Sequence, residues 1–173
     1  GLYMICTLSK HAAEKDGFYR VDQGRLQYLE AEGQYAMVER APGVLLLSDV
    51  KRAGKPILRN GSASLWDIGD GVACLEFHTK MNAIDPDILG MIGKSVAAVG
   101  KDYKALVLHN ESSNYSVGVN LGLALFAINL AAWPMMEDMV KQGQDAFKAL
   151  KFAPFPVVGA PSGMALGGGC ESL

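Results

Sequence analysis

The sequence has few cysteines and histidines, and none of them has the spacing of a metal-binding motif or a disulfide framework. Its three cysteines, Cys6, Cys74 and Cys170, are an odd number and lie far apart, with no Cys-x-x-Cys pair among them. The three histidines are equally scattered. We therefore expect neither disulfides nor a metal site, and the reduced thiols favour a cytoplasmic protein.

The sequence also lacks a basic patch, a dinucleotide fingerprint and an uninterrupted apolar run. Lysine and arginine number 16 against 18 acidic residues, for a net charge of −2, and no basic run alternates with aromatics, which argues against a nucleic-acid partner. No Gly-x-Gly-x-x-Gly turn occurs, so an NAD-binding domain is not expected. Glycine, asparagine and proline interrupt the longest apolar stretch, residues 117–136, so no membrane helix is predicted.

Residues 1–63 are expected to form an irregular or helical connector. Charges are dense there, glycine and proline punctuate the sequence, and apolar runs are short. Residues 28–50 favour one or two short helices, with Pro42 and Gly43 as the break between them. The chain begins without methionine and without a basic leader, so we expect it to be a piece of a longer protein.

Residues 64–173 show strand and helix patterns in alternation, which is typical of an α/β domain. Residues 65–68 and 72–77 predict a hairpin around an Asp-Gly turn. Asp85 and Pro86 then predict the start of a helix, because aspartate is a good N-cap and proline is favoured at the first helical position.

Two continuous apolar runs, residues 105–108 and 155–160, are predicted to be neighbouring strands buried on both faces. A helix is expected between them over residues 137–150. Its expected buried positions are Met139, Val140, Ala146, Phe147 and Leu150. Parallel strands place the turns that follow them at one sheet edge, so residues 116–120 and 167–171 should lie together there.

Residues 167–171, Gly-Gly-Gly-Cys-Glu, are the first candidate for a chemical site. Glycines let a ligand approach the main chain, and a helix that starts here would offer free N–H groups and its positive dipole end to an oxyanion. A phosphate loop is excluded, because no Gly-Lys-Ser/Thr follows. A glycine triplet by itself is also compatible with a tight turn or with close helix packing.

Residues 155–160 (Phe-Pro-Val-Val-Gly-Ala) and 162–171 (Ser-Gly-Met-Ala-Leu-Gly-Gly-Gly-Cys-Glu) together resemble the signature of the crotonase, or enoyl-CoA hydratase/isomerase, superfamily. Residues 80–84 (Lys-Met-Asn-Ala-Ile) are similar to its Asn-Ala loop, and residues 116–120 (Ser-Val-Gly-Val-Asn) to its Ala-Gly-Ala-Asp turn. The resemblance covers residues 64–173 and implies the crotonase-like (ClpP/crotonase) α/β fold, built of ββα units.

The resemblance implies a site for an acyl-CoA or enoyl-CoA thioester as substrate, with no permanently bound cofactor. Two backbone N–H groups, which map onto Val119 and Gly168, would hold the thioester oxygen, where negative charge develops in an enolate-like transition state. Glu171 maps onto a catalytic glutamate that handles the water or substrate proton. The other residues that map onto CoA- or substrate-binding positions are Asn82, Ala83, Gly118 and Gly167. Taken alone, Glu171 could equally stabilise its own helix, by ~0.3–1 kcal/mol, and Asn82 could simply form a turn.

Two departures from the family pattern bear on activity. Asn120 stands where aspartate is common, which alters the local charge but leaves the Val119 N–H in place. Hydratases of the family use a second glutamate further along, whereas this chain stops at Leu173. We therefore expect a fold that is truncated at its C-terminus and an isolated chain that is inactive. A homo-oligomer is expected only of the intact protein, because the family's association elements would lie further along the chain.

Residues 15–20 (Lys-Asp-Gly-Phe-Tyr-Arg) carry a second, shorter resemblance, to the C-terminal domain of 3-hydroxyacyl-CoA dehydrogenases. Such dehydrogenases are fused to crotonase modules in some fatty-acid β-oxidation proteins. The leading hypothesis is therefore the hydratase/isomerase module of a multifunctional β-oxidation protein, with residues 1–63 as the end of its dehydrogenase part. The alternative is a catalytically silent interface domain that at most binds CoA, with residues 126–139 as its contact surface.

Overall fold

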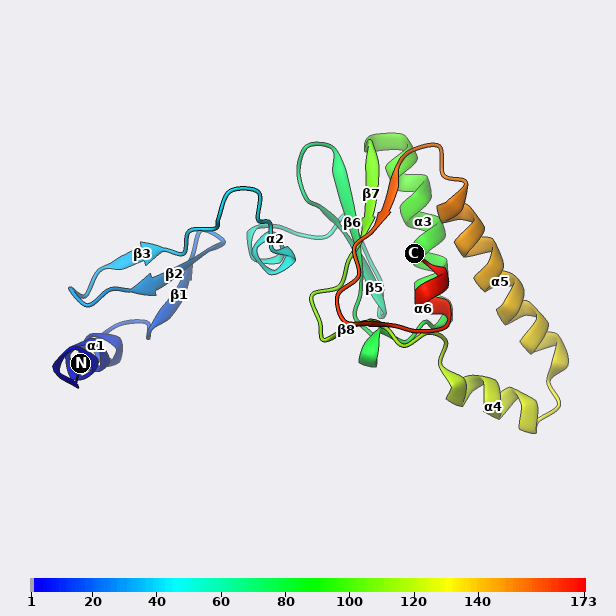
Figure 1. Ribbon diagram of the computed structural model, residues 1–173, viewed down its shortest axis with the longest axis horizontal. Coiled ribbons are helices and arrows are strands. Elements are labelled where there is room, and N and C mark those ends of the chain that lie inside the picture. Colours follow the sequence, from blue (N-terminus) through cyan, green and yellow to red (C-terminus); the bar gives the residue numbers. More distant parts are fainter. Residues whose placement is uncertain (1) are drawn as a thin grey trace. The chain divides into compact units, whose positions relative to one another are not determined.

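The computed structural model describes residues 2–173, with the side chains of residues 4–122 and 124–173, and divides the chain into two compact units (Figure 1). The first unit is Gly1–Lys55 and the second is Pro56–Leu173. The division falls earlier than residue 64 because strand β4 (Leu58–Arg59) already belongs to the second unit's sheet. None of the described helices combines the length and the apolar character that a membrane crossing requires.

The first unit contains a three-stranded antiparallel sheet, so the prediction of a helical or irregular connector is wrong here. Its elements are α1 (Leu2–Glu14), β1 (Tyr19–Asp22), β2 (Arg25–Leu29), β3 (Tyr35–Met37) and α2 (Leu47–Ala53). Gln23 and Gly24 have positive φ angles of 48° and 77°, as a two-residue type I′ hairpin turn requires. That turn joins β1 to β2 and pairs Asp22 with Arg25, and it takes the backbone out of any helical path.

The second unit is built on a five-stranded mixed sheet of order β4-β5-β6-β7-β9 (Figure 1). β4, β5 and β6 are antiparallel, whereas β6, β7 and β9 are parallel, and a separate parallel pair joins β8 to β10. The predicted hairpin and the predicted pairing of two apolar runs as neighbouring strands are both confirmed. The strand bounds are β5 (Ala63–Asp67), β6 (Val72–Phe77), β7 (Ala105–Leu108), β8 (Asn114–Ser116), β9 (Val157–Gly159) and β10 (Met164–Ala165).

Helices cover one face of this sheet. The predicted helix start is confirmed, because the Asp85 side chain accepts a hydrogen bond of 2.8 Å from the Ile88 N–H and Pro86 is the first helical residue. The long helix α3 packs on β5, β6 and β7, and α5 packs on α3, as Figure 1 shows. The helix bounds are η1 (Lys80–Asn82), α3 (Pro86–Asp102), α4 (Leu121–Asn129), α5 (Trp133–Lys151) and α6 (Gly168–Glu171).

The core lies between α3 and the sheet face toward it, and it corrects two predictions of burial. Leu106 and Leu108 of β7 are fully buried in it, as are Ile88 and Ile92 of α3. Strand β9 is an edge strand with one face open, so Val158 is 52% exposed and not buried as predicted. On α5, Ala146 and Leu150 are buried and Met139 and Phe147 are half-buried, whereas Val140 is 56% exposed because it faces a hollow.

Helix α4 is an apolar element with little cover. Among its described side chains only Ala127 is buried, while Leu121 is 71% and Phe126 is 61% exposed. No charged residue occurs between Glu111 and Glu137, a segment that includes the whole of α4 and the start of α5. An apolar helix in this setting is suited to contact with another apolar surface.

Candidate functional site

The turn at residues 116–120 follows β8, and its hydrogen bonding leaves one N–H group unused. Ile84 and Val119 form an isolated parallel bridge, in which the Ile84 N–H donates to the Gly118 carbonyl and the Asn120 N–H donates to the Ile84 carbonyl. In such a bridge the middle residue directs its own N–H and carbonyl away from the partner. The Val119 N–H accordingly has no hydrogen-bond partner in the described part of the chain.

The second turn, at residues 166–169, leaves another N–H group unused. Gly167 has φ 49° and ψ −125°, and the Gly169 N–H donates to the Leu166 carbonyl at 2.9 Å, which together make a type II′ turn. Only glycine adopts this conformation readily at the first central position. Gly168 comes next and begins α6; it is buried, yet its N–H has no partner within residues 2–173. Buried N–H groups without a partner are rare, because each costs free energy comparable to a lost hydrogen bond.

The two unused N–H groups belong to segments in direct contact. A Cβ atom built on Gly118 would lie 2.6 Å from the Leu166 carbonyl oxygen and 3.1 Å from the Gly168 nitrogen. A Cβ atom on Gly168 would in turn lie 3.6 Å from Cγ2 of Val119 and 3.3 Å from Cδ1 of Ile84. The prediction that the two glycine-bearing turns lie together therefore agrees with the geometry, and the residues that carry the two free backbone donors are neighbours.

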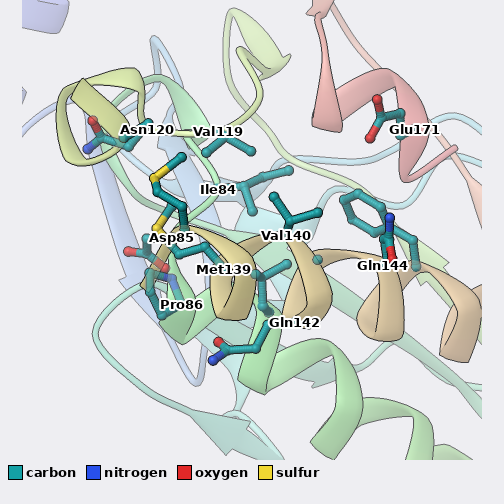
Figure 2. A pocket seen from close by; sticks show the side chains of 15 residues that line it. Ile84, Asp85, Pro86, Val119, Asn120, Met139, Val140, Gln142, Gln144 and Glu171 are labelled. Atoms are coloured by element: carbon teal, nitrogen blue, oxygen red, sulfur yellow. The ribbon is translucent and has the colours of Figure 1, made fainter. Parts of the chain in front are cut away.

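A cavity of about 280 Å³ lies beside these turns, between the start of α3 and the helices α4 and α5. Figure 2 shows Val119, Ile84 and Val140 around its middle, with Glu171 at one side and Asp85 at the other. Its apolar lining comes mainly from α5 and the start of α3, and Val119 belongs to the first turn: Ile84, Pro86, Leu89, Val119, Ala124, Met136, Met139, Val140 and Phe147. An apolar pocket with a few polar groups at its border is the usual form of a small-molecule site.

Glu171 is the carboxylate of this site that makes no structural contact. It lies in the single turn of α6, three residues after Gly168, and its side chain is exposed and lines the cavity. No hydrogen bond or ion pair of its carboxylate occurs within the described residues. A free carboxylate at the border of the cavity is suited to proton transfer.

Two other polar side chains that line the cavity are occupied as helix caps. Asp85 caps α3 and also accepts a hydrogen bond of 2.6 Å from the Ser62 hydroxyl. Asn120 caps α4, because its side-chain oxygen accepts from the Gly122 N–H at 3.0 Å. An aspartate here would have met the same N–H group, so asparagine preserves the cap and removes one negative charge from the cavity.

Asn82 and Ala83 lie outside the cavity lining. Asn82 is buried with φ 52°, and its amide donates to the Ser112 hydroxyl at 2.9 Å and to the Asn114 carbonyl at 2.8 Å. The Ala83 carbonyl accepts a bond of 2.7 Å from the Thr79 hydroxyl. These contacts give Asn82 a turn-forming role, and its amide is committed to holding the loop against β8.

The sequence did not identify the α4–α5 wall as part of the site. Met136, Met139 and Phe147 belong to an amphipathic helix, and the pattern gave no reason to separate a pocket wall from ordinary core. The one available signal was the methionine content of residues 135–139, because methionine suits adaptable apolar sites. No cluster of histidine, cysteine, aspartate and glutamate suited to a metal occurs in the described residues.

Comparison with known proteins gives relatives that are much longer than this chain. It is 37% identical over 155 residues to the "Probable 3-hydroxyacyl-CoA dehydrogenase" of Bacillus subtilis (strain 168), a match that covers 90% of this chain and 20% of that protein. It is 29% identical over 125 residues to the "Putative fatty acid oxidation complex trifunctional enzyme" of Rickettsia felis, a match that covers 72% of this chain and 17% of that protein. The chain thus spans about a fifth of the length of the curated relatives it matches. No family model matches it.

Solved structures with a similar fold include enoyl-CoA hydratases. A putative enoyl-CoA hydratase of Streptomyces coelicolor A3(2) superposes with a TM-score of 0.59 at 21% identity, covering 77% of this chain and 47% of that one. An enoyl-CoA hydratase/isomerase from Xanthobacter autotrophicus Py2 gives a TM-score of 0.58 at 23% identity, covering 66% and 43%. At this level of identity the comparison concerns the fold.

Proposed function

Because this chain carries the crotonase fold and is related to multifunctional fatty-acid oxidation enzymes, we propose that it is an enoyl-CoA hydratase/isomerase module. In this proposal the module binds acyl-CoA and enoyl-CoA thioesters and stabilises an enolate on the thioester oxygen. The backbone N–H groups of Val119 and Gly168 form the oxyanion hole. Gly118 and Gly167 shape the two turns that present these groups, and no resident cofactor takes part.

The observation that carries the proposal is the pair of unused N–H groups beside an apolar cavity. The parallel bridge with Ile84 leaves the Val119 N–H free, and the type II′ turn leaves the Gly168 N–H free on a buried residue. A thioester oxygen between them would satisfy both donors. Loss of one such donor typically costs about 2.7–4 kcal/mol of barrier.

Glu171 is the proposed general acid and base. Its carboxylate has no hydrogen bond or ion pair within the described residues, and it lies in the single turn of α6, three residues after Gly168. A group that moves a proton must stand near the carbon that gains or loses it, and the shared helical turn supplies this proximity. The apolar lining from α4 and α5 would receive the acyl chain.

The wider context of the module is a multifunctional β-oxidation protein. The second unit alone is shorter than the 155-residue match to the Bacillus subtilis dehydrogenase, so that match extends into the first unit. This supports the proposal that the first unit belongs to the dehydrogenase part of such a protein. The intact protein would be a homo-oligomer, as the family resemblance implies.

A second candidate is a catalytically silent crotonase-like interface domain. The specific observation in its favour is the exposed apolar surface of α4, on which Leu121 and Phe126 are largely uncovered. A silent domain does not require the N–H groups of Val119 and Gly168 to donate to the same thioester oxygen. The two functions are therefore separated by whether a bound thioester oxygen is polarised.

Infrared difference spectroscopy of crotonyl-CoA labelled with ¹³C at the thioester carbonyl tests the proposal on this chain. Two N–H donors weaken the carbonyl bond, so the labelled band should move to lower frequency on binding, beyond its position in water. Unlabelled free CoA should displace the ligand and abolish the shifted band. Binding with an unshifted carbonyl, or the absence of binding, would contradict the enzyme module and favour the silent domain.

A further inference from the structure

Tyr115 in β8 is fully buried and has a single hydroxyl partner in the described residues. Its Oη lies 3.3 Å from Oγ of Ser172, which is itself buried. The Ser172 hydroxyl donates its one hydrogen to the Gly169 carbonyl at 2.8 Å. Because serine has no second hydrogen to give, Tyr115 must be the donor to Ser172. The two hydrogen bonds run from the Tyr115 hydroxyl to the Ser172 hydroxyl and on to the Gly169 carbonyl, and they link β8 to α6. We call this chain of hydrogen bonds the relay.

The relay ends on the helical turn that holds the proposed chemistry. Gly169 directly follows Gly168, whose N–H is one proposed oxyanion donor, and Ser172 directly follows Glu171. α6 has only four residues, so its own backbone bonds fix it weakly, and an additional bond to its first turn matters more than in a long helix.

The other end of the relay lies on the strand that leads to the second donor. Tyr115 is followed by Ser116, whose buried hydroxyl donates to the Asn82 carbonyl at 2.6 Å and accepts from the Gly118 N–H at 3.1 Å. Gly118 in turn precedes Val119. Two adjacent residues of β8 therefore hold the two turns, Ser116 the one with Val119 and Tyr115 the one with Gly168.

From this arrangement we propose that Tyr115, acting through Ser172, is a positioning residue that sets the distance between the Val119 and Gly168 N–H groups. The proposal rests on the proposed oxyanion hole and goes beyond it by assigning a side chain that touches neither substrate nor cofactor. Burial raises the pKa of Tyr115, so the phenol remains a neutral donor through the physiological range. Ser172→Ala leaves the buried Tyr115 hydroxyl without its partner, whereas Tyr115→Phe leaves the Ser172 hydroxyl with its bond to Gly169 alone.

The test compares Tyr115→Phe and Ser172→Ala with two matched controls that remove a hydroxyl elsewhere in the second unit. Tyr103→Phe removes a phenol that contacts Asp67, and Ser64→Ala removes a buried hydroxyl that contacts His78. Each variant of this chain is bound to ¹³C-labelled crotonyl-CoA for infrared measurement, and amide hydrogen exchange of α6 is followed without ligand. Turnover of a short enoyl-CoA is measured in the full-length protein.

We expect the two relay variants to bind the thioester as tightly as the unaltered chain but to lose much of the carbonyl shift and to expose α6 to exchange. Turnover should fall about 10- to 100-fold at unchanged KM, since a displacement near 1 Å can cost about 10²-fold. The double variant Tyr115→Phe/Ser172→Ala should resemble either single variant, because each substitution breaks the same relay. Ser172→Thr, which keeps the hydroxyl, should retain the carbonyl shift. The controls Tyr103→Phe and Ser64→Ala should retain the carbonyl shift too.

A carbonyl shift that Tyr115→Phe leaves intact, while the unaltered chain shows it, would overturn the relay and leave the oxyanion hole standing. A merely structural role would lower the melting temperature with the shift and KM unchanged, and this result would overturn the relay too. If the unaltered chain binds the thioester with no shift at all, the proposed function fails, and the relay proposal fails with it.

Discussion

The Cβ position of Gly118 lies 2.6 Å from the carbonyl oxygen of Leu166, closer than any side chain can approach. Gly118→Ala should therefore push the 166–168 turn away, and its φ of +83° adds strain. We expect a loss of stability of more than about 1 kcal/mol and loss of the carbonyl shift of bound crotonyl-CoA. Gly93→Ala is the control, because no atom lies within 4 Å of its Cβ position on α3, and it should stabilise the protein by about 1 kcal/mol. An unaltered shift in Gly118→Ala would contradict the proposed contact between the turns.

Glu171→Gln keeps the shape and hydrogen-bonding capacity of the side chain but removes the group that accepts or delivers a proton. In the full-length protein we expect hydration of crotonyl-CoA to fall about 10²–10⁴-fold with little change in affinity. Glu137→Gln on the exposed side of α5 should leave turnover unchanged. A decrease of less than about tenfold, accompanied by a lower melting temperature, would identify Glu171 as a helix-stabilising residue instead.

Met139→Trp should fill the cavity between α3 and α5. In the unaltered chain, affinity should rise as the acyl chain lengthens, by up to about 0.8 kcal/mol for each buried methylene, until the cavity is full. The tryptophan should remove this rise while short thioesters still bind. Met135→Trp is the control, because Met135 lies on the same helix outside the cavity lining. Calorimetric titration with acetyl-, butyryl- and octanoyl-CoA measures the affinity of each variant. If the affinity of Met139→Trp still rises with chain length, the acyl chain binds elsewhere.

The buried phenol of Tyr115 predicts a loss of stability at alkaline pH. Burial, with a smaller contribution from nearby Cys74, raises its pKa above that of an exposed tyrosine. A raised pKa in the folded state means that this stability is complete below the unfolded pKa of about 10 and is lost as the pH rises further. Thermal unfolding followed from pH 8 to 11 should show a steeper decline for the unaltered chain than for Tyr115→Phe. Equal slopes would show that Tyr115 does not ionise on unfolding in this range.

Much of the second unit follows from local sequence signals. Asp85 and Pro86 identify the start of α3 without tertiary information, because capping and a fixed φ act within one turn. The strands β7 and β9 are recognisable as apolar runs, yet the exposure of Val158 is not, since it depends on what packs against the edge of the sheet. Whether both faces of a strand are buried depends on the elements that pack against it, and the apolar sequence of the strand alone does not specify those elements.

The first unit shows where local sequence signals are insufficient to predict the structure. Gln23 and Gly24 form a type I′ turn, but glutamine is not among the residues usually found there, so the hairpin signal was weak. The site shows a similar limit. The glycine triplet pointed to Gly168, whereas the reason that the Val119 N–H is free, its bridge to Ile84, depends on a pairing between residues distant in sequence.

The parallel pairing of β7 with β9 has a consequence for the order in which this unit acquires its shape. β5 and β6 are joined by a tight hairpin and β7 follows β6 after the single long helix α3, whereas β9 reaches β7 only after the chain has passed through α4 and α5. Closing so long a loop costs entropy before any contact compensates, so we expect this strand to join late. Gly168 lies beyond β9 and Val119 before α4, so their meeting completes the process. The time at which thioester affinity appears during refolding would then report the last folding step, in which the two turns meet. Partly folded molecules would bind no thioester.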